Sequence, residues 1–303
     1  MNVKDLAKKK PGLVSGHRMC PGCGAAIIAR QALLASDYPV VVANATGCLE
    51  VSTTIYPFTS WNVPWIHNAF ENAAATISGV ESAYQSFRRQ GKIKKDIKFI
   101  AFGGDGGTYD IGLQSLSGAL ERGHDFLYIC YDNEAYMNTG IQRSSATPKG
   151  AWTNTSQVGS AQMGKKRFKK DMTKIVIAHN IPYVAQASIS NHIDFMKKVK
   201  KALDTPGPSF INVISPCPRG WRFPAHLSVD IAKLAVDTCF WPLFEYEDGV
   251  YTINYDPGKN KKPVGEWIKS QKRFAHVAND KEFLNEMQER IDKQWLELKS
   301  KVK

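Results

Sequence analysis

The chain is 303 residues long, with 43% hydrophobic and 22% charged residues, a composition that supports a globular fold with a sizeable core. Forty Lys and Arg against 28 Asp and Glu give a net charge of +12, which favours acidic partners. No apolar run approaches the roughly 18 residues that a membrane span requires, so membrane proteins are excluded together with collagens, coiled coils and disordered tails.

The first motif along the chain is a C-x-x-C turn from Cys20 to Cys23, with Pro and Gly between the two thiols. Zinc, an iron–sulfur cluster, a redox dithiol and coincidence all remain open for this turn. A metal would need two further ligands from distant parts of the chain, because no second C-x-x-C lies nearby. The Lys-rich start, Met1 to Lys10, is no signal peptide. We therefore expect a reducing compartment, the cytoplasm.

Apolar runs and helical patterns then alternate. Buried strands are expected at 39–43, 97–102, 126–131, 183–187 and 210–214. Helices are expected at 24–35, 111–122 and 192–203. This alternation predicts an α/β fold with a doubly wound, mainly parallel sheet covered by helices on both faces.

A chemically active residue follows four of these strands. These residues are Cys48, Asp105, Asn133 and Cys217. In open parallel sheets, ligands bind beyond the carboxyl ends of the strands. We therefore expect the four side chains to share one edge of the sheet and to form the functional site.

The Gly-Asp-Gly sequence at 104–106 lies between a predicted strand and a predicted helix. Glycine lets the backbone approach a diphosphate closely, and the start of a helix offers free N–H groups. Phosphates would repel Asp105 unless a divalent cation lay between them, and Mg²⁺ prefers oxygen ligands of this kind. Asn133 offers a second oxygen, and the turn Asn138-Thr139-Gly140 follows it.

Residues 146–170 predict a long surface loop, and its length suggests a functional role. The densest basic run of the chain lies in its last part, and we interpret the run as a solvated face. Its members are Lys165, Lys166, Arg167, Lys169 and Lys170.

After residue 240 the pattern changes. Residues 243–247 and 250–254, joined by Asp248-Gly249, predict a β-hairpin. Asn279 is expected to cap a final helix, whose apolar stripe is Leu284, Met287, Ile291, Trp295 and Leu298. We divide the chain into an α/β domain, 1–240, and a tail, 241–303, packed on the domain or on a partner subunit.

Longer segments of the sequence resemble one particular protein family. "GHRMCPGCGA", "ATGCLEVSTTIYPFTSW", "IHNAFENAAATISGVESAY", "FGGDGGTYDIGLQSLSGALERGH", "YDNEAYMNTGIQRSS" and "SPCPRGW" resemble the β subunit of pyruvate:ferredoxin oxidoreductase. Gly-Asp-Gly with its downstream asparagine resembles the diphosphate motif of thiamine-diphosphate (ThDP) enzymes. The resemblance extends from about Gly16 to Cys217 and, with less diagnostic content, into the tail.

The resemblance implies CoA-dependent oxidative decarboxylation of pyruvate to acetyl-CoA and CO₂, with electrons passed to ferredoxin. It implies a [4Fe–4S] cluster held by Cys20, Cys23, Cys48 and Cys217, and Mg²⁺ held by Asp105, Asn133 and the main-chain carbonyl of Ala135. It assigns ThDP binding to Thr46, Gly47, Gly104, Asp105, Gly106, Asn133, Asn138 and Thr139. Cys130 and Cys239 are left as buried structural thiols. His67 and Glu71 lie in a segment that either approaches the active site or is structural.

Such a subunit does not work alone. The resemblance implies an α subunit that supplies the activating glutamate and most of the substrate pocket, with γ and δ subunits, ferredoxin, coenzyme A and a 2-oxo acid as further partners. A second interpretation of the basic run at Lys165 is a surface that faces an acidic ferredoxin.

We considered three alternatives. The first is the same chemistry on a branched-chain 2-oxo acid, 2-oxoglutarate or oxalate. The second is a non-enzymatic zinc protein that uses the four cysteines structurally. The third is a nucleic-acid-binding protein, which we reject because the positive charge is dispersed and aromatic residues such as Trp61 and Trp65 are not interleaved with basic ones.

Overall fold

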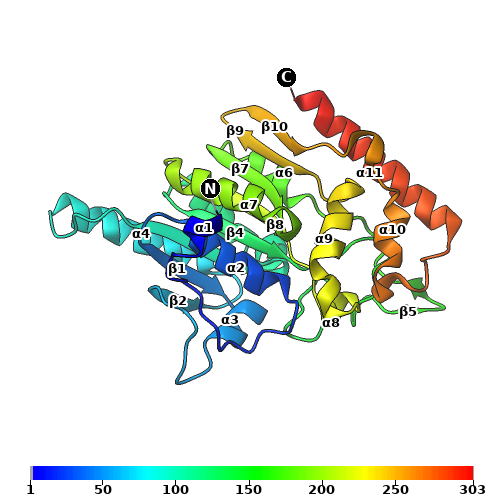
Figure 1. Ribbon diagram of the computed structural model, residues 1–303, viewed down its shortest axis with the longest axis horizontal. Coiled ribbons are helices and arrows are strands. Elements are labelled where there is room, and N and C mark those ends of the chain that lie inside the picture. The colour runs from blue at the N-terminus through cyan, green and yellow to red at the C-terminus, as the bar shows by residue number, and fades with distance from the viewer. Residues whose placement is uncertain (1–2, 303) are drawn as a thin grey trace.

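The computed structural model describes residues 3–302, which form one large sheet with helices on both faces (Figure 1). The strands of this sheet are β1 (Val40–Ala45), β2 (Trp65–Asn68), β3 (Lys98–Gly104), β4 (Leu127–Asp132), β7 (Tyr183–Ser188), β8 (Ser209–Ile214), β9 (Leu243–Glu247) and β10 (Val250–Tyr255). Their order is β10-β9-β7-β8-β4-β3-β1-β2. The neighbours from β2 to β7 pair in parallel, whereas β9 and β10 are antiparallel. The predicted fold class is confirmed.

Every strand predicted in the α/β part is present, and the sheet has one further strand. β2 pairs in parallel with β1 at the edge of the sheet, and its register places Asn44 beside His67. The predicted hairpin is also present as β9 and β10. β9 pairs with β7, so the hairpin extends the central sheet. The domain boundary proposed at residue 240 stays a prediction. Residues 1–2 and 303 lie outside the part of the chain that the structure describes.

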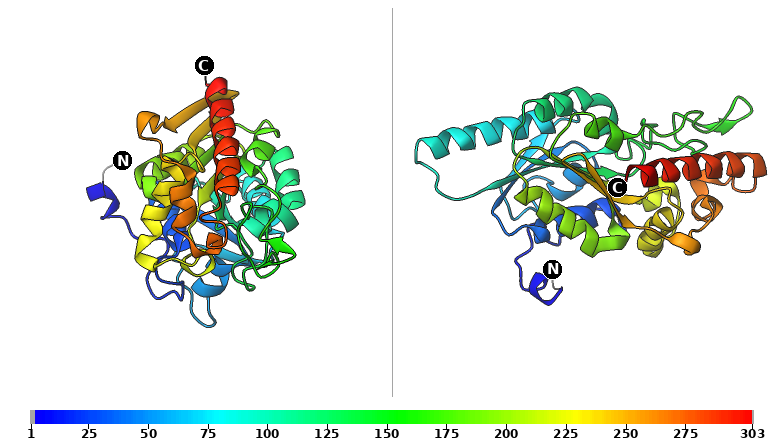
Figure 2. Two further views of the ribbon diagram at one scale, coloured as in Figure 1. Left: turned by 90° about the vertical axis from the view of Figure 1, so that its right-hand side faces the viewer. Right: turned by 90° about the horizontal axis from the view of Figure 1, so that it is seen from above.

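Two groups of helices cover the sheet. α2 (Gly24–Ala35), α7 (His192–Asp204) and α9 (Ser228–Asp237) lie toward one face, and α4 (Ala73–Arg89), α5 (Leu113–Glu121) and α6 (Met172–Ile177) cover the other (Figures 1 and 2). Shorter helices are α1 (Val3–Leu6), α3 (Cys48–Thr53), α8 (Pro218–Trp221) and α10 (Val264–Lys269). Turns of other helical types are η1 (Gly106–Ile111), η2 (Ile189–Asn191), η3 (Ala225–Leu227), η4 (Gly258–Asn260) and η5 (Lys272–Phe274).

The strands are buried on both faces because helices lie on both sides. Val42 and Ile100 belong to the core on the α2 and α7 side, whereas their neighbours Ala43 and Ala101 belong to the core on the α4 and α5 side. This explains why the strand sequences are continuous apolar runs rather than alternating patterns. No described helix combines the length and apolar character needed to cross a membrane.

The last helix, α11 (Lys281–Lys301), lies along the domain edge, as Figure 2 shows in red. Four of the five residues of its predicted apolar stripe are buried, whereas Leu284 is half-buried and Phe283 is buried instead. Its buried residues are Phe283, Met287, Ile291, Trp295 and Leu298. The prediction for its cap was wrong by one residue. The Asp280 side chain, not that of Asn279, accepts the N–H of Phe283 at the start of the helix.

The long loop, 146–170, is largely irregular and contains a small hairpin of β5 (Val158–Gly159) and β6 (Gln162–Met163). The prediction of a solvated basic run was wrong for three of its lysines. Lys165 is only 5% exposed. Lys169 forms ion pairs with buried carboxylates, and Lys170 pairs with Asp110. Lys169 folds inward because the buried carboxylates need a counter-charge, whereas Lys165 donates to the backbone carbonyls of Ser145 and Thr147. Lys166 and Arg167 remain exposed.

Candidate functional site

The carboxyl ends of β1, β3 and β4 surround a pocket. Its lining includes every residue predicted to contact the cofactor except Asp105, which lies beneath it. The lining residues are Thr46, Gly47, Cys48, Phe70, Gly104, Gly106, Gly107, Tyr131, Asn133, Ala135, Tyr136, Met137, Asn138 and Thr139. The fold therefore brings the predicted site residues from three strand ends to one place, at the edge where open parallel sheets bind ligands.

Asp105 is fully buried at the end of β3 and is held from two directions. Its Oδ1 accepts the backbone N–H groups of Asn133 at 3.2 Å and Glu134 at 3.1 Å. Its Oδ2 accepts the hydroxyl of Ser144 at 2.5 Å. Burial raises the pKa of Asp105 well above its usual value, and the charge of Asp132 is the second-largest cause of this rise. A cation beside Asp105 would relieve this electrostatic cost.

The Asn133 amide supplies the geometry for such a cation. One atom of its amide lies 2.9 Å from Oδ1 of Asp105 and 2.8 Å from the carbonyl oxygen of Ala135. With the nitrogen in that position, the amide donates to both oxygens. With the oxygen there, three acceptor oxygens face one another, which is the donor set that Mg²⁺ prefers. The residues present therefore fit a divalent cation.

The pocket walls fit a bound group in two further ways. A Cβ added at Gly47 would lie 2.7 Å from the Tyr131 hydroxyl, and one added at Gly106 would lie 2.3 Å from the Tyr136 ring. Both positions therefore need glycine for the close approach of backbone to side chain. The Tyr131 hydroxyl is buried without a hydrogen-bond partner in the described structure. An unpaired polar group in a glycine-lined wall is suited to a polar ligand.

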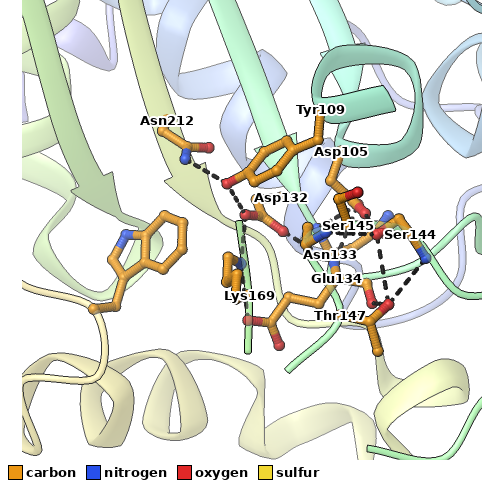
Figure 3. A network of polar contacts seen from close by, with 12 residues as sticks. Asp105, Tyr109, Asp132, Asn133, Glu134, Ser144, Ser145, Thr147, Lys169 and Asn212 are labelled. Carbon is orange, nitrogen blue, oxygen red and sulfur yellow. Dashed lines mark hydrogen bonds and ion pairs between the residues drawn. The ribbon is translucent and has the colours of Figure 1, made fainter. Parts of the chain in front are cut away.

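Sequence reasoning missed a buried ionic network beneath residues 133–135, the proposed metal loop (Figure 3). Lys169 lies 2.6 Å from Asp132 and 3.0 Å from Glu134. The Tyr109 hydroxyl donates to Asp132 at 2.5 Å, and Asn212 donates to that hydroxyl at 2.7 Å. Burial lowers the pKa of Lys169, but the two carboxylates outweigh burial and the net pKa is raised. Lys169 is therefore a fixed positive charge under the site.

The loop after Arg143 closes over this region. Besides the bond from Ser144 to Asp105, the Thr147 hydroxyl donates to the carbonyl of Glu134 at 2.7 Å. The "QRSS" stretch that contains Ser144 was part of the family resemblance, but its local pattern assigned no role to Ser144.

The four predicted cluster cysteines form a second group beside the pocket. Burial raises the pKa of Cys48 to about 12, and the next contributions come from Cys217, Cys23 and Cys20. Burial likewise raises the pKa of Cys23 to about 11, followed by Cys217. The N–H of Gly24 donates to Pro216 O at 3.1 Å, which joins the two cysteine segments directly. The segments that carry Cys23 and Cys217 therefore lie side by side, although they are distant in sequence.

Two features bear on metal binding by these thiols. The Gly220 N–H donates to the Cys217 sulfur at 3.3 Å, as expected where backbone groups stabilise thiolates. Among residues 3–302, the His, Cys, Asp and Glu side chains form no group of three or more that could hold a metal ion. The amide and carbonyl donors beside Asp105 lie outside that class of side chains. A four-iron cluster separates its thiolates more widely than a single ion does.

The remaining predicted residues are placed as follows. Cys130 is fully buried and Cys239 is 5% exposed, so both are the buried thiols that we expected. His67 lies at the sheet edge, with Nδ1 2.9 Å from Oε1 of Glu50. Glu71 is exposed, and neither His67 nor Glu71 lines the pocket.

Comparisons with known proteins agree with this geometry. Residues 45–213 match the family described as thiamine pyrophosphate enzyme, C-terminal TPP binding domain. The chain is 54% identical over 307 residues to pyruvate synthase subunit PorB of Thermotoga maritima, covering 97% of this chain and 94% of that protein. It is 59% identical over 267 residues to pyruvate synthase subunit PorB of Methanocaldococcus jannaschii, covering 88% and 89%.

Two further similarities are informative. Ketoisovalerate oxidoreductase subunit VorB of Pyrococcus abyssi is 47% identical over 286 residues, covering 94% of this chain and 91% of that protein. Among solved structures, 2-oxoglutarate:ferredoxin oxidoreductase from Magnetococcus marinus aligns with a TM-score of 0.56 and 20% identity, covering 77% of this chain and 80% of that chain. At this identity the structural likeness shows a shared fold.

Proposed function

Because the chain belongs to the pyruvate synthase PorB family of 2-oxoacid oxidoreductase β subunits, we propose that it binds Mg²⁺–ThDP and a [4Fe–4S] cluster for CoA-dependent oxidation of pyruvate. Membership in an enzyme family overturns the alternative of a non-enzymatic zinc protein. One observation carries the proposal: Thr46 and Gly47 line the same pocket as the Asp105 loop, and Cys48 follows them directly. A cofactor in this pocket would lie beside Cys48, one of the four proposed cluster cysteines.

In this proposal, Mg²⁺ is held by Asp105, by the Asn133 amide oxygen and by the main-chain carbonyl of Ala135. The glycines at 104 and 106 let the diphosphate approach the backbone, and Asn138 and Thr139 close the pocket from the other side. Bound ThDP supplies the electron sink for decarboxylation of a 2-oxo acid. The contribution of this chain is to fix the diphosphate end and to exclude water from it.

Cys20, Cys23, Cys48 and Cys217 would hold the [4Fe–4S] cluster, which accepts electrons one at a time. The raised thiol pKa values indicate a buried, low-dielectric environment, and the N–H of Gly220 is a donor to one of the sulfurs. Burial and hydrogen bonds of this kind tune the potential of such clusters.

Partners complete the reaction. The relatives are named as subunits, which supports a multi-subunit enzyme. We propose that an α subunit covers the open pocket and supplies the activating glutamate and substrate pocket, and that coenzyme A, ferredoxin and γ and δ subunits take part. The six cysteines of the chain are unpaired, in keeping with a reducing compartment such as the cytoplasm.

Pyruvate is the preferred substrate because two relatives with more than half their residues identical carry the name pyruvate synthase. A branched-chain 2-oxo acid is the second candidate, because the 47% identical VorB relative is named for ketoisovalerate. 2-Oxoglutarate and oxalate belong in the same test.

The deciding experiment is anaerobic purification of the chain with the subunits that copurify. ThDP, magnesium, iron and sulfide are then assayed, and turnover is measured on a panel of 2-oxo acids with and without coenzyme A. We expect bound ThDP and iron, and CoA-dependent turnover that is fastest with pyruvate. Material that holds neither ThDP nor iron would contradict the proposal, and faster turnover of a branched-chain acid would change the substrate.

A further inference from the structure

Glu134 occupies an unusual position between the proposed metal donors. It lies between the Asn133 amide and the Ala135 carbonyl, and its backbone has a φ of 69°. Its carboxylate is fully buried, with Lys169 on Oε1 at 3.0 Å and Arg273 on Oε2 at 2.5 Å. The left-handed backbone and the two ion pairs together fix the direction of the peptide groups on both sides of Glu134.

Arg273 reaches this loop from far along the sequence. It lies in η5, after the hairpin of the tail, and only 2% of it is exposed. Its Nε donates to the Gln271 side chain at 2.9 Å, and its Nη2 pairs with Glu134. Since a buried charge needs full compensation, Arg273 has little freedom to move away from the loop.

Trp221 contacts both Arg273 and the metal loop. The guanidinium carbon lies 4.1 Å from the centre of a Trp221 ring. The Trp221 indole N–H donates to the carbonyl oxygen of Asn133 at 2.8 Å. The Trp221 backbone N–H donates to the carbonyl of Cys217 at 2.8 Å. One short segment thus carries a proposed cluster cysteine at one end and a contact with the metal loop at the other.

The charge of Arg273 also lies close to the Cys217 segment. The guanidinium stacks on Trp221, whose backbone N–H donates to the carbonyl of Cys217. A buried positive charge near a cluster favours its reduced, more negative state, and so raises its potential.

We propose that Arg273 is a positioning residue that ties the Cys217 segment to the metal loop and so sets both the affinity for Mg²⁺–ThDP and the potential of the cluster. This inference rests on the proposed function. Arg273 acts through Glu134 and Trp221 and touches neither cofactor. Its position in the tail explains why the last part of the chain is folded against the site.

The test uses the anaerobically purified complex with its copurifying subunits. Four variants are compared with the wild type: Arg273→Gln, Arg273→Lys, Trp221→Phe and Lys272→Gln. After ThDP is removed, the affinity for added ThDP is measured by calorimetry in excess Mg²⁺. Iron is assayed, and the cluster midpoint potential is measured by redox titration followed by electron paramagnetic resonance.

Arg273→Gln should weaken ThDP binding about tenfold, as loss of partners around metal ligands does, and should shift the potential to more negative values with iron retained. Arg273→Lys should weaken ThDP binding but keep the potential, because the charge remains while the planar contact with Trp221 is lost. Trp221→Phe should weaken binding about three- to tenfold, since only one hydrogen bond is removed. Lys272→Gln, which removes the neighbouring exposed charge, should leave both quantities unchanged.

Wild-type affinity for ThDP in both Arg273→Gln and Trp221→Phe would overturn the inference. If Arg273→Gln does not fold, Arg273→Lys and Trp221→Phe provide the test. Unchanged affinity for ThDP in both of these variants would also overturn the inference. A wild-type complex that binds no ThDP with Mg²⁺ present would instead refute the proposed function. The two failures are therefore distinguishable.

Discussion

The hydroxyl of Ser144 donates a hydrogen bond to Oδ2 of Asp105 at 2.5 Å, across 39 positions of sequence. This bond occupies one carboxylate oxygen from the loop side and leaves Oδ1 facing the Asn133 amide. Asp105 is thus oriented before any cation arrives. Such orientation is the ordinary role of outer partners around a metal ligand.

We predict that Asp105→Ala abolishes retention of Mg²⁺–ThDP. Loss of outer partners alone costs about 10–100-fold in metal affinity, so loss of the ligand itself should exceed about a hundredfold. Iron content should stay at the wild-type level, because the thiols are separate groups. The control is Asp125→Ala, which removes a carboxylate paired with Lys98 just before β4 begins. ThDP content unchanged in Asp105→Ala, measured after gel filtration, would contradict the metal assignment.

We predict that Cys217→Ser lowers the iron and sulfide content of the complex, because one of the four thiolates is lost. Cys239→Ser is the matched control, since Cys239 is also buried but lines a pocket that none of the four proposed cluster cysteines lines. It should keep full iron. Equal iron in the two variants would mean that another residue is the fourth ligand.

Gly106→Ala should weaken ThDP binding. The added Cβ would lie 2.3 Å from the Tyr136 ring, and relief of such overlap costs about 1–3 kcal/mol and displaces a pocket wall. Gly79→Ala in helix α4 meets no atom within 4 Å and should stabilise the protein by about 1 kcal/mol without an effect on ThDP. Calorimetry and thermal unfolding measure the two effects. Equal ThDP affinity in both variants would contradict the assignment of Gly106 to the ThDP-binding pocket.

Lys165 should give the protein a distinct pH dependence. Burial, and then the charge of Lys169, lower the pKa of Lys165 from 10.5 to about 8. Between these two values the unfolded chain carries the proton and the folded chain does not. The free energy of unfolding should therefore rise with pH across this interval, by at most about 1.4 kcal/mol per pH unit.

Urea unfolding at several pH values measures this dependence. Lys165→Met should lose the rise, whereas Lys166→Met should keep it, because Lys166 is exposed. A wild-type stability curve parallel to that of Lys165→Met across the interval would show that Lys165 stays charged when folded.

Local patterns predicted most of the sheet, because each buried strand is a short apolar run that ends in small or polar residues. β2 was missed because its four residues, Trp65–Asn68, lie next to Pro64 and show no alternation. Helix α4 was also missed, although its sequence has a helical apolar pattern with Ala74, Ile77 and Tyr84 on the buried face. Strand β2, by contrast, is defined by what it packs against rather than by its own sequence.

Cys48, Asp105, Asn133 and Cys217 could be placed at one edge of the sheet because each follows a strand, and parallel strands end at one edge. Cys20 and Cys23 follow no strand of the described chain, and only the family resemblance joined them to this group. The network around Glu134 could not be predicted. Lys169 and Arg273 are far from it in sequence, and a basic residue in a loop or a short helical turn normally lies in solvent. The interpretation of Lys169 as solvated was wrong because Asp132 and Glu134 are buried, and this is visible only in three dimensions.

The late position of Arg273 bears on how the enzyme is assembled in the cell. A nascent chain that has left the ribosome only as far as α8 contains all the proposed ligands but lacks Arg273, one of the two cations that compensate Glu134. By the inference above, such a chain should bind ThDP more weakly than the complete one. A product shortened after β10 should form most of its sheet and yet release ThDP, so that incomplete subunits are not charged with cofactor.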